Sequence, residues 1–215
     1  ASMKRLHLFE FTDLPWWPDA WKAMETDYLG AANRLLGLYR PAIAHLVGVI
    51  RALACHRLVD LCAGAGRHYR EVIEQVDRDR HWPIRATLTD LHPNLAAYCR
   101  THAEDPRIDY IAAQVDAASV PADLAGFPTL FAGLHHFRPE LARRILADSA
   151  RRGEGIAVFE HTRRGLAGMI PMLFTPLLVW LFTPFIRPFS ASRLFWTYVV
   201  PVAPLMVLWD GLVSS

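Results

Sequence analysis

The sequence predicts an α/β protein built on a doubly wound, mainly parallel sheet, with helices before the sheet and an apolar, largely helical tail after it. Between residues 55 and 163, short apolar strands alternate with amphipathic helical segments. Such alternation favours parallel strands joined by right-handed crossovers. Composition also changes twice along the chain, which predicts three regions: a helical cap at 3–54, the sheet at 55–163, and the tail at 164–215.

Two helices are expected in the cap. Pro18 and Pro41 stand where helices begin, because proline suits the first helical turn. Trp21 and Tyr28 belong to a set of apolar residues at near-helical spacing, and residues 41–54 form a second apolar stretch. These side chains are expected to form a helical core.

Five strands and three intervening helices are expected in the middle region. The strands are predicted at 56–61, 84–90, 109–117, 128–134 and 155–161, and the helices at 69–76, 93–103 and 138–152. In doubly wound sheets, ligands bind beyond the carboxyl ends of the strands. The residues that follow each strand are therefore the first candidates for function.

The overall composition excludes several classes of protein. A chain of 215 residues with 53% hydrophobic and 20% charged residues can bury a core. A net charge of +2 gives no sign of a nucleic-acid partner. The three cysteines lack the spacing of a metal site, so we expect free thiols and no metal. Because residues 4–18 contain no signal-peptide stretch, a cytoplasmic location is expected.

Gly64 and Gly66 lie in a turn of small residues between the first strand and the following helix. Backbone N–H groups and a helix N-terminus meet a ligand in such a turn. A dinucleotide fingerprint would have a third glycine where this chain has Tyr69, and a phosphate loop would contain Gly-Lys-Ser/Thr, which is absent. Both phosphate-binding interpretations are therefore disfavoured.

Aspartates stand at the ends of three successive strands: Asp60, Asp90 and Asp116. Carboxylates would repel a pyrophosphate, whereas an ammonium group, a ribose diol and an adenine amino group all favour acceptors. S-adenosyl-L-methionine carries these three groups. The alternative for each residue alone is a local cap or turn, which is common for aspartate.

These segments resemble the motifs of the class I S-adenosylmethionine-dependent methyltransferases. "VDLCAGAG" resembles the first motif, "LTDLHPN" the second, "AAQVDAAS" the third and "LFAGLHHF" the fourth, and the similarity spans residues 57–161. The resemblance implies a Rossmann-like fold, S-adenosyl-L-methionine as cofactor and a small-molecule substrate. Many members have glycine where this chain has Cys62.

The resemblance also implies a role for individual residues in binding the cofactor. Gly64 and Gly66, with Cys62 and Ala63 beside them, would let the backbone approach the methionyl part. Asp60 would orient this loop or face the amino group. From the other two loops, Asp90 would accept the ribose hydroxyls, Leu91 would pack on the adenine, Asp116 would accept from the adenine amino group, and the Ala117 backbone would meet the ring edge.

Two histidines follow the fourth strand and are candidates for catalysis. His135 is the first choice as a general base and His136 the second, because imidazole can accept a proton at neutral pH. The alternative is that they only shape the pocket. Glu160 and His161, at the end of the fifth strand, form a weaker candidate pair. By analogy, Trp17 and Tyr28 could line the substrate side.

The tail contains two stretches without a charged residue, 166–186 and 194–209. The first is long enough to cross a membrane, but prolines interrupt both, so two straight spans are not expected. Three interpretations of the tail stay open: a lid over a hydrophobic substrate pocket, a subunit interface, or a membrane-facing hairpin through 166–209. The family usually closes its sheet with strands 6 and 7, which we expect to be absent here.

The function expected from the sequence is methyl transfer from S-adenosyl-L-methionine to a small, hydrophobic or aromatic acceptor. One alternative is a non-catalytic protein of the same fold that serves binding or assembly at a membrane. A second is a nicotinamide-dependent oxidoreductase. A homo-oligomer is expected, because an uncovered edge strand is an aggregation hazard.

Overall fold

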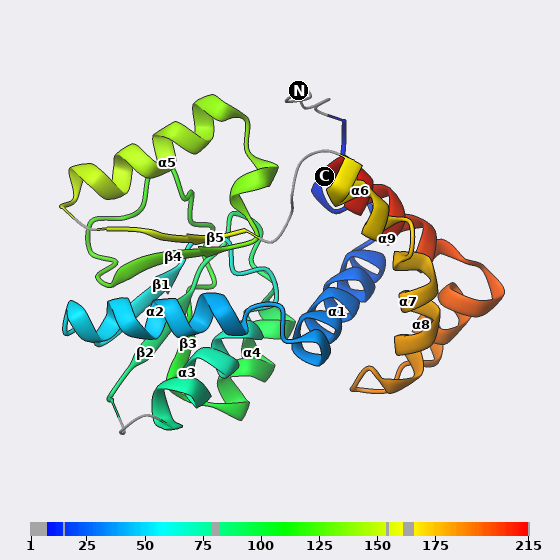
Figure 1. The fold of residues 1–215 in the computed structure, drawn as a ribbon, viewed down its shortest axis with the longest axis horizontal. Helices are drawn as coiled ribbons and strands as arrows, with labels where there is room; N and C mark the ends of the chain where they lie inside the picture. The colour runs from blue at the N-terminus through cyan, green and yellow to red at the C-terminus, as the bar shows by residue number, and fades with distance from the viewer. Residues whose placement is uncertain (1–7, 15, 79–81, 154, 161–165, 215) are drawn as a thin grey trace. The chain divides into compact units, whose positions relative to one another are not determined.

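The computed structural model describes residues 8–14, 16–78, 82–153, 155–160 and 166–214. The chain divides into two compact units (Figure 1). One, the sheet unit, is Gly37–His161. The other, the helical unit, combines Ala1–Leu36 with Thr162–Ser215.

The sheet unit contains five parallel strands in the order β3-β2-β1-β4-β5 among its described residues (Figure 1). The strands are β1 Arg57–Asp60, β2 Arg85–Leu88, β3 Ile108–Tyr110, β4 Phe127–Phe131 and β5 Ala157–Phe159. The order runs outward from β1 in both directions. The predicted doubly wound parallel sheet is therefore confirmed.

Helices cover both faces of this sheet. The connecting helices are α3 His68–Arg78, α4 Leu95–Glu104 and α5 Pro139–Arg151, with α2 Arg40–Ala52 before β1 and a short turn, η2 Leu134–His136, after β4. Leu58 of β1 packs in the cluster formed with α2, α3 and α4. Its neighbour Val59 packs in a second cluster with Ile145 of α5. Successive residues of the strand thus point their side chains to opposite faces of the sheet, and helices cover both faces, as is typical of parallel sheets.

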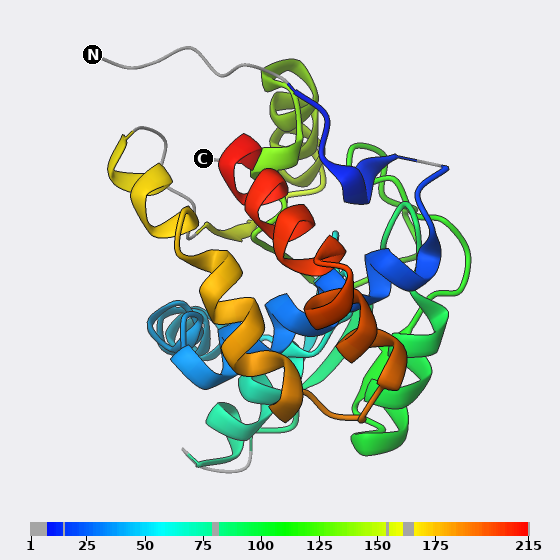
Figure 2. The same ribbon diagram turned by 90° about the vertical axis from the view of Figure 1, so that its right-hand side faces the viewer.

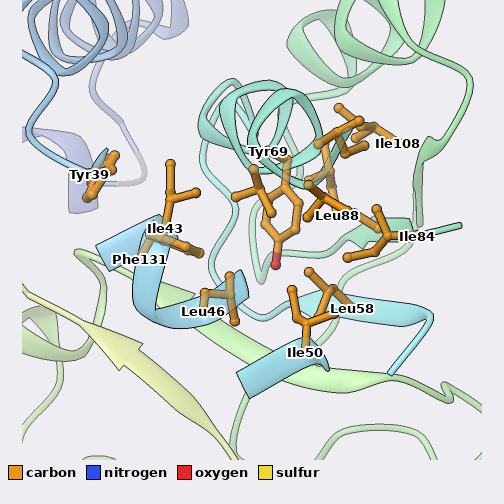
Figure 3. Close-up of a cluster of buried hydrophobic side chains, with 14 of the residues drawn as sticks. Tyr39, Ile43, Leu46, Ile50, Leu58, Tyr69, Ile84, Leu88, Ile108 and Phe131 are labelled. Atoms are coloured by element: carbon orange, nitrogen blue, oxygen red, sulfur yellow. The ribbon is translucent and has the colours of Figure 1, made fainter. Parts of the chain in front are cut away.

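The larger cluster lies between the sheet and α2 and α3 (Figure 3). Tyr69 is one of its two largest fully buried side chains, and the ring lies between α3 and the strands with its oxygen directed at the sheet (Figure 3). The Tyr69 hydroxyl hydrogen-bonds Oγ1 of Thr129 on β4. Because Thr129 Oγ1 also donates to the Val59 carbonyl oxygen at 3.3 Å, this buried polar group is satisfied. Tyr69 therefore serves the core at the position where a dinucleotide fold would have glycine.

The boundary predicted after residue 54 differs from the structure. The helix α2, assigned to the cap from sequence, belongs to the sheet unit. Ile43, Leu46 and Ile50 of α2 are buried in the cluster that contains Leu58 of β1. The apolar stripe of α2 is thus used to cover the sheet, which spacing alone could not specify.

The helical unit is built from the first long helix and the tail. Its elements are η1 Phe11–Asp13, α1 Asp19–Leu36, α6 Leu166–Met172, α7 Thr175–Phe182, η3 Thr183–Phe185, α8 Ala191–Leu194, η4 Phe195–Val199 and α9 Val202–Ser214. The helices α7 and α9 lie side by side (Figure 2). Its core includes Tyr28 and Ala31 of α1 with Val179 of α7 and Val207 of α9.

Two buried charged residues join distant segments within the helical unit. The Asp210 carboxylate on α9 accepts hydrogen bonds from the backbone N–H groups of Phe11 and Thr12, at 2.8 and 3.2 Å. Arg193 is 5% exposed; its guanidinium lies 3.0 Å from Oδ2 of Asp27 and donates to the Ile186 carbonyl oxygen at 2.8 Å. These pairings explain why charged side chains are tolerated within an apolar unit.

All described elements after residue 166 are helical, so within the described residues the sheet ends with β5. This agrees with the expectation that strands 6 and 7 are absent. The tail forms short helices because Pro171, Pro176 and Pro184 interrupt the apolar run.

The Tyr69–Thr129 hydrogen bond should be measurable in a double-mutant cycle. We expect Tyr69→Phe and Thr129→Val each to lower the free energy of unfolding by about 1 kcal/mol, since each breaks the same buried bond. In urea denaturation the double mutant should lose less than the sum of the two. Strict additivity would contradict the coupling.

Candidate functional site

The carboxyl ends of β1 and β2 meet at one edge of the sheet. Asp60 pairs in parallel register with Leu88 of β2 and with Thr129 of β4. Beyond β2, the Asp90 carbonyl oxygen accepts the Val115 N–H at 2.9 Å, which brings the segment after β3 alongside. The structure therefore gathers the three predicted aspartates, Asp60, Asp90 and Asp116, at this edge.

The turn after β1 adopts a backbone that favours glycine at two positions. Gly64 has φ +57° and Gly66 has φ +66°. A Cβ at Gly66 would lie 2.3 Å from Cδ1 of Leu88, whereas a Cβ at Gly64 would meet nothing within 4 Å. The Ala63 N–H donates to the Thr89 carbonyl oxygen at 3.0 Å and fixes the start of the turn. The absence of a side chain at Gly66 thus allows close packing against Leu88. At Gly64 it leaves the backbone open on the side where a Cβ would point.

Asp60 lies beneath this turn and is fully buried. Nε2 of His68, the first residue of α3, lies 2.9 Å from its Oδ2, a contact with the distance but not the alignment of a hydrogen bond. Burial raises the pKa of Asp60, and the neighbouring His68 opposes that rise. Of the two roles expected for Asp60, its burial favours orienting the loop over direct contact with a ligand.

Asp90 connects the turn after β1 to the turn after β2. Its Oδ2 accepts the Gly64 N–H at 3.1 Å, and its Oδ1 accepts the His92 N–H at 2.9 Å. The local turn considered as an alternative role is therefore present. Since each carboxylate oxygen has a second lone pair, the same side chain retains acceptor capacity.

Leu91 and Asp116 are exposed beside Asp90, whereas Ala117 is buried. Leu91 is 47% exposed and so presents an apolar side chain next to Asp90. Oδ1 of Asp116 accepts the Ala118 N–H at 2.8 Å, which fixes the turn that contains Ala117. The apolar side chain of Leu91 is next to the acceptor Asp90 in sequence, and the acceptor Asp116 is next to Ala117.

Cys62 is a partly buried free cysteine in the turn after β1. Burial, followed by the charges of Asp90, Asp60, Asp116 and Glu160, raises its pKa well above the ordinary thiol value. The thiol is therefore protonated at neutral pH and is a poor nucleophile. A Cβ at Gly133, after β4, would lie 3.0 Å from the Cys62 Cβ, so the two loops pack closely.

His135 and Glu160 form a pair across β4 and β5. Nδ1 of His135 lies 2.7 Å from Oε2 of Glu160, while Oε1 accepts the backbone N–H groups of Leu134 and His135, at 2.7 and 3.2 Å. Both side chains are largely buried, at 12% and 24% exposed. The carboxylate thus fixes both the loop and the imidazole ring.

Burial tends to raise the pKa of Glu160, but the hydrogen bond and charge of His135 and the two backbone N–H groups outweigh it. The pKa of Glu160 is consequently lower than the ordinary glutamate value. Glu160 is therefore ionised at neutral pH and accepts a hydrogen bond from Nδ1–H of His135. In the neutral ring, this tautomer leaves Nε2 as the acceptor nitrogen.

The pairing of Glu160 with His135 was not predicted, because the sequence analysis paired Glu160 with its neighbour His161. His161 lies outside the described residues. A usable signal existed: His135 follows β4 and Glu160 follows β5, and adjacent parallel strands end at the same edge. His136 is more exposed, and its ring centroid lies 4.2 Å from that of His135.

The expected substrate-side aromatic residues belong to the helical unit. Tyr28 is 5% exposed and packs in that unit's core with Ala31 and Val179, so its ring is not available to a ligand. The Trp17 indole N–H donates to the Met206 sulfur at 3.1 Å. The predicted role of Tyr28 is therefore wrong, because its burial is structural.

Within the part of the chain that the structure describes, no cluster of three or more His, Cys, Asp or Glu side chains could hold a metal ion.

No model of a known protein family matches this chain, and no curated protein matches it. Among solved structures, it is similar to an O-methyltransferase family protein from Burkholderia thailandensis, with 22% identity and a TM-score of 0.42 over 56% of this chain and 37% of that one. It is also similar to PigF with SAH, with 18% identity and a TM-score of 0.44 over 67% of this chain and 41% of that one. The chain thus spans about two fifths of the length of these structures.

The two glycines should differ in their tolerance of a side chain. Gly64→Ala should lower the free energy of unfolding by about 1 kcal/mol, the cost of a left-handed backbone. Gly66→Ala should lose about 1–3 kcal/mol more, since its Cβ meets Leu88. Urea denaturation of both variants measures the difference, and equal losses would contradict the packing role of Gly66.

The Glu160 pair should make a pH-dependent contribution to stability. A carboxyl with a lowered pKa stabilises the fold above its ordinary value of 4.5, and the contribution is lost as pH falls through the native pKa. Glu160→Gln should therefore be less stable than the wild type at neutral pH, and the gap should close in acid. A gap that is constant across this range would contradict the pairing.

Proposed function

We propose that this protein binds S-adenosyl-L-methionine at the carboxyl edge of the sheet and transfers its methyl group to a small molecule. The observation that carries the proposal is the meeting of three loops, one with a bare glycine backbone at Gly64 and two with the acceptors Asp90 and Asp116. Each loop follows a different strand.

The chemistry of these residues fits the groups of the cofactor. The remaining lone pairs of Asp90 suit a ribose diol, the exposed Leu91 suits an adenine ring, and Asp116 suits the adenine amino group. The acidic surroundings of Cys62 favour a cationic ligand. They disfavour a pyrophosphate, and with it the nicotinamide alternative.

When bound, S-adenosyl-L-methionine supplies a methyl group on a cationic sulfur that is open to in-line displacement. The protein's part is to align the acceptor atom and to exclude water. The pair of His135 and Glu160 adds a proton acceptor: the carboxylate holds Nδ1–H of His135, and Nε2 takes the proton from an acceptor hydroxyl. Glu160 is a positioning residue in this scheme and stays ionised.

This pair suits acceptors whose nucleophile is protonated at neutral pH, such as a phenol or an alcohol. An acceptor that is already deprotonated would have no need of a base. We therefore propose a small hydroxyl-bearing molecule, hydrophobic or aromatic in its remaining part, as the substrate.

Calorimetric titration with S-adenosyl-L-methionine and with its demethylated product tests the binding site. We expect binding of both to the wild type and about 10- to 100-fold weaker binding to Asp90→Asn, which loses a charged acceptor. Asp123→Asn, a matched change at an exposed aspartate of the same unit, should bind normally. Heat on titration with NADH and none with the methyl donor would instead support the nicotinamide alternative.

Methyl transfer to a panel of small phenols and alcohols tests the chemistry. His135→Ala should lower turnover by about 10²–10⁴-fold while the cofactor affinity stays nearly unchanged. Glu160→Gln should retain more activity and shift the pH profile, since its carboxylate acts through His135. Cofactor binding without transfer to any acceptor would favour the alternative of a non-catalytic binding protein.

A further inference from the structure

We propose that the helical unit docks on the surface of a lipid bilayer through the exposed apolar face of α6, α7 and η3. This docking face consists of Ile170, Leu173, Phe174, Leu177, Leu181 and Phe185. The proposal concerns a surface that the methyl-transfer site does not use.

The docking face belongs to a single stretch of chain with the composition of a membrane segment. By length and composition, Gly168–Phe185 is apolar enough to cross a membrane, with a mean hydropathy of 1.6, yet only 17% of it is buried. Leu173 is 60% exposed and Phe185 is 69% exposed. Soluble proteins seldom leave several large apolar side chains of one helical stretch exposed to water.

The helix α7 is apolar on all its sides. Val179 is buried in the core of the helical unit, where Leu178 and Phe182 also pack. The opposite side presents Leu177 and Leu181 to the outside. A helix that is hydrophobic all round belongs in an apolar medium on both sides, and the protein covers only one of them.

Polar groups near the docking face are satisfied within the chain itself. The hydroxyls of Thr175 and Thr183 donate to the carbonyl oxygens of Met172 and Val179, at 2.7 and 2.6 Å. The Trp180 indole N–H donates to the Thr197 carbonyl oxygen at 3.1 Å, and the Tyr198 hydroxyl donates to the Trp180 carbonyl oxygen. Hydrocarbon requires such internal pairing because it offers no hydrogen-bond partner. The membrane-like length and hydropathy of the stretch favour lipid over a second protein chain.

The geometry favours docking over crossing. The run Gly168–Phe185 has the length to cross a bilayer, but one side of it, at Val179, packs in the core of the helical unit against residues of α1 and α9. Pro171 lies inside α6, and prolines begin α7 and η3, so the run is divided into three short helical segments. Beyond η3, the exposed Arg187 and Phe189 combine a cation with an aromatic ring, as is typical of the headgroup region.

Co-sedimentation of the full chain with phosphatidylcholine vesicles tests the proposal. We expect the wild type to pellet with the vesicles, and Leu177→Asp and Leu181→Asp each to weaken the partitioning about tenfold or more, since each puts a charge on the docking face. Leu146→Asp, on an exposed leucine of α5 in the sheet unit, is the matched control and should pellet like the wild type. Leu177→Gln, a milder change, guards against misfolding, and unchanged circular dichroism verifies the fold of each variant.

Three results would overturn the proposal. The wild type could remain in the supernatant as a monomer, which would indicate that the protein itself covers the docking face and that the tail acts as a lid. Sedimentation velocity could show a dimer that Leu177→Asp dissociates, with no vesicle binding, which would assign the face to a second copy. Resistance to extraction at alkaline pH would indicate a membrane-spanning segment rather than a docked one.

Discussion

The parallel pairing of β1 with β2 on one side and β4 on the other is the constraint on which the rest of the sheet unit depends. Asp60 ends β1 in register with Leu88 and Thr129, so the loops that follow these three strands must start at one edge. The hydrogen bond from the Gly64 N–H to Asp90 then joins two of these loops directly. An antiparallel neighbour on either side would send the following loop to the opposite edge and remove the site.

Burial makes this edge chemically unusual. Burial affects the pKa of Asp60, Cys62 and Glu160, and the resulting shift differs because the partners of each side chain differ. Burial raises the pKa of Asp60, and His68 opposes that rise. Burial, together with the charges of the nearby carboxylates, raises the pKa of the Cys62 thiol and keeps it protonated. Glu160 has three N–H partners and stays ionised. Different surroundings thus give these three groups different protonation behaviour at one edge of the sheet.

The sequence predicts the doubly wound parallel sheet and the position of the site because both follow from local signals: apolar runs, small-residue turns, and aspartates at strand ends. It does not predict which helices cover the sheet. The apolar stripe of α2 would suit any apolar surface, and only the assembled structure shows that Ile43 and Leu46 pack on β1. The pair of His135 and Glu160 joins residues 25 positions apart, so no local pattern reveals it, and only their positions after neighbouring parallel strands indicate it. Tyr28 is an aromatic residue of the kind that lines substrate pockets, yet in the structure it is buried in the core of the helical unit.

The central claim is that one adenosyl cofactor contacts all three loops at once. Amide NMR spectra of the labelled protein, recorded with and without S-adenosylhomocysteine, test it most directly. The account predicts that the resonances of Gly64, Leu91 and Ala117 shift together, while those of Arg57 and Arg85, at the amino ends of β1 and β2, stay in place. Shifts confined to the arginine end of the strands, or at only one of the three loops, would contradict it.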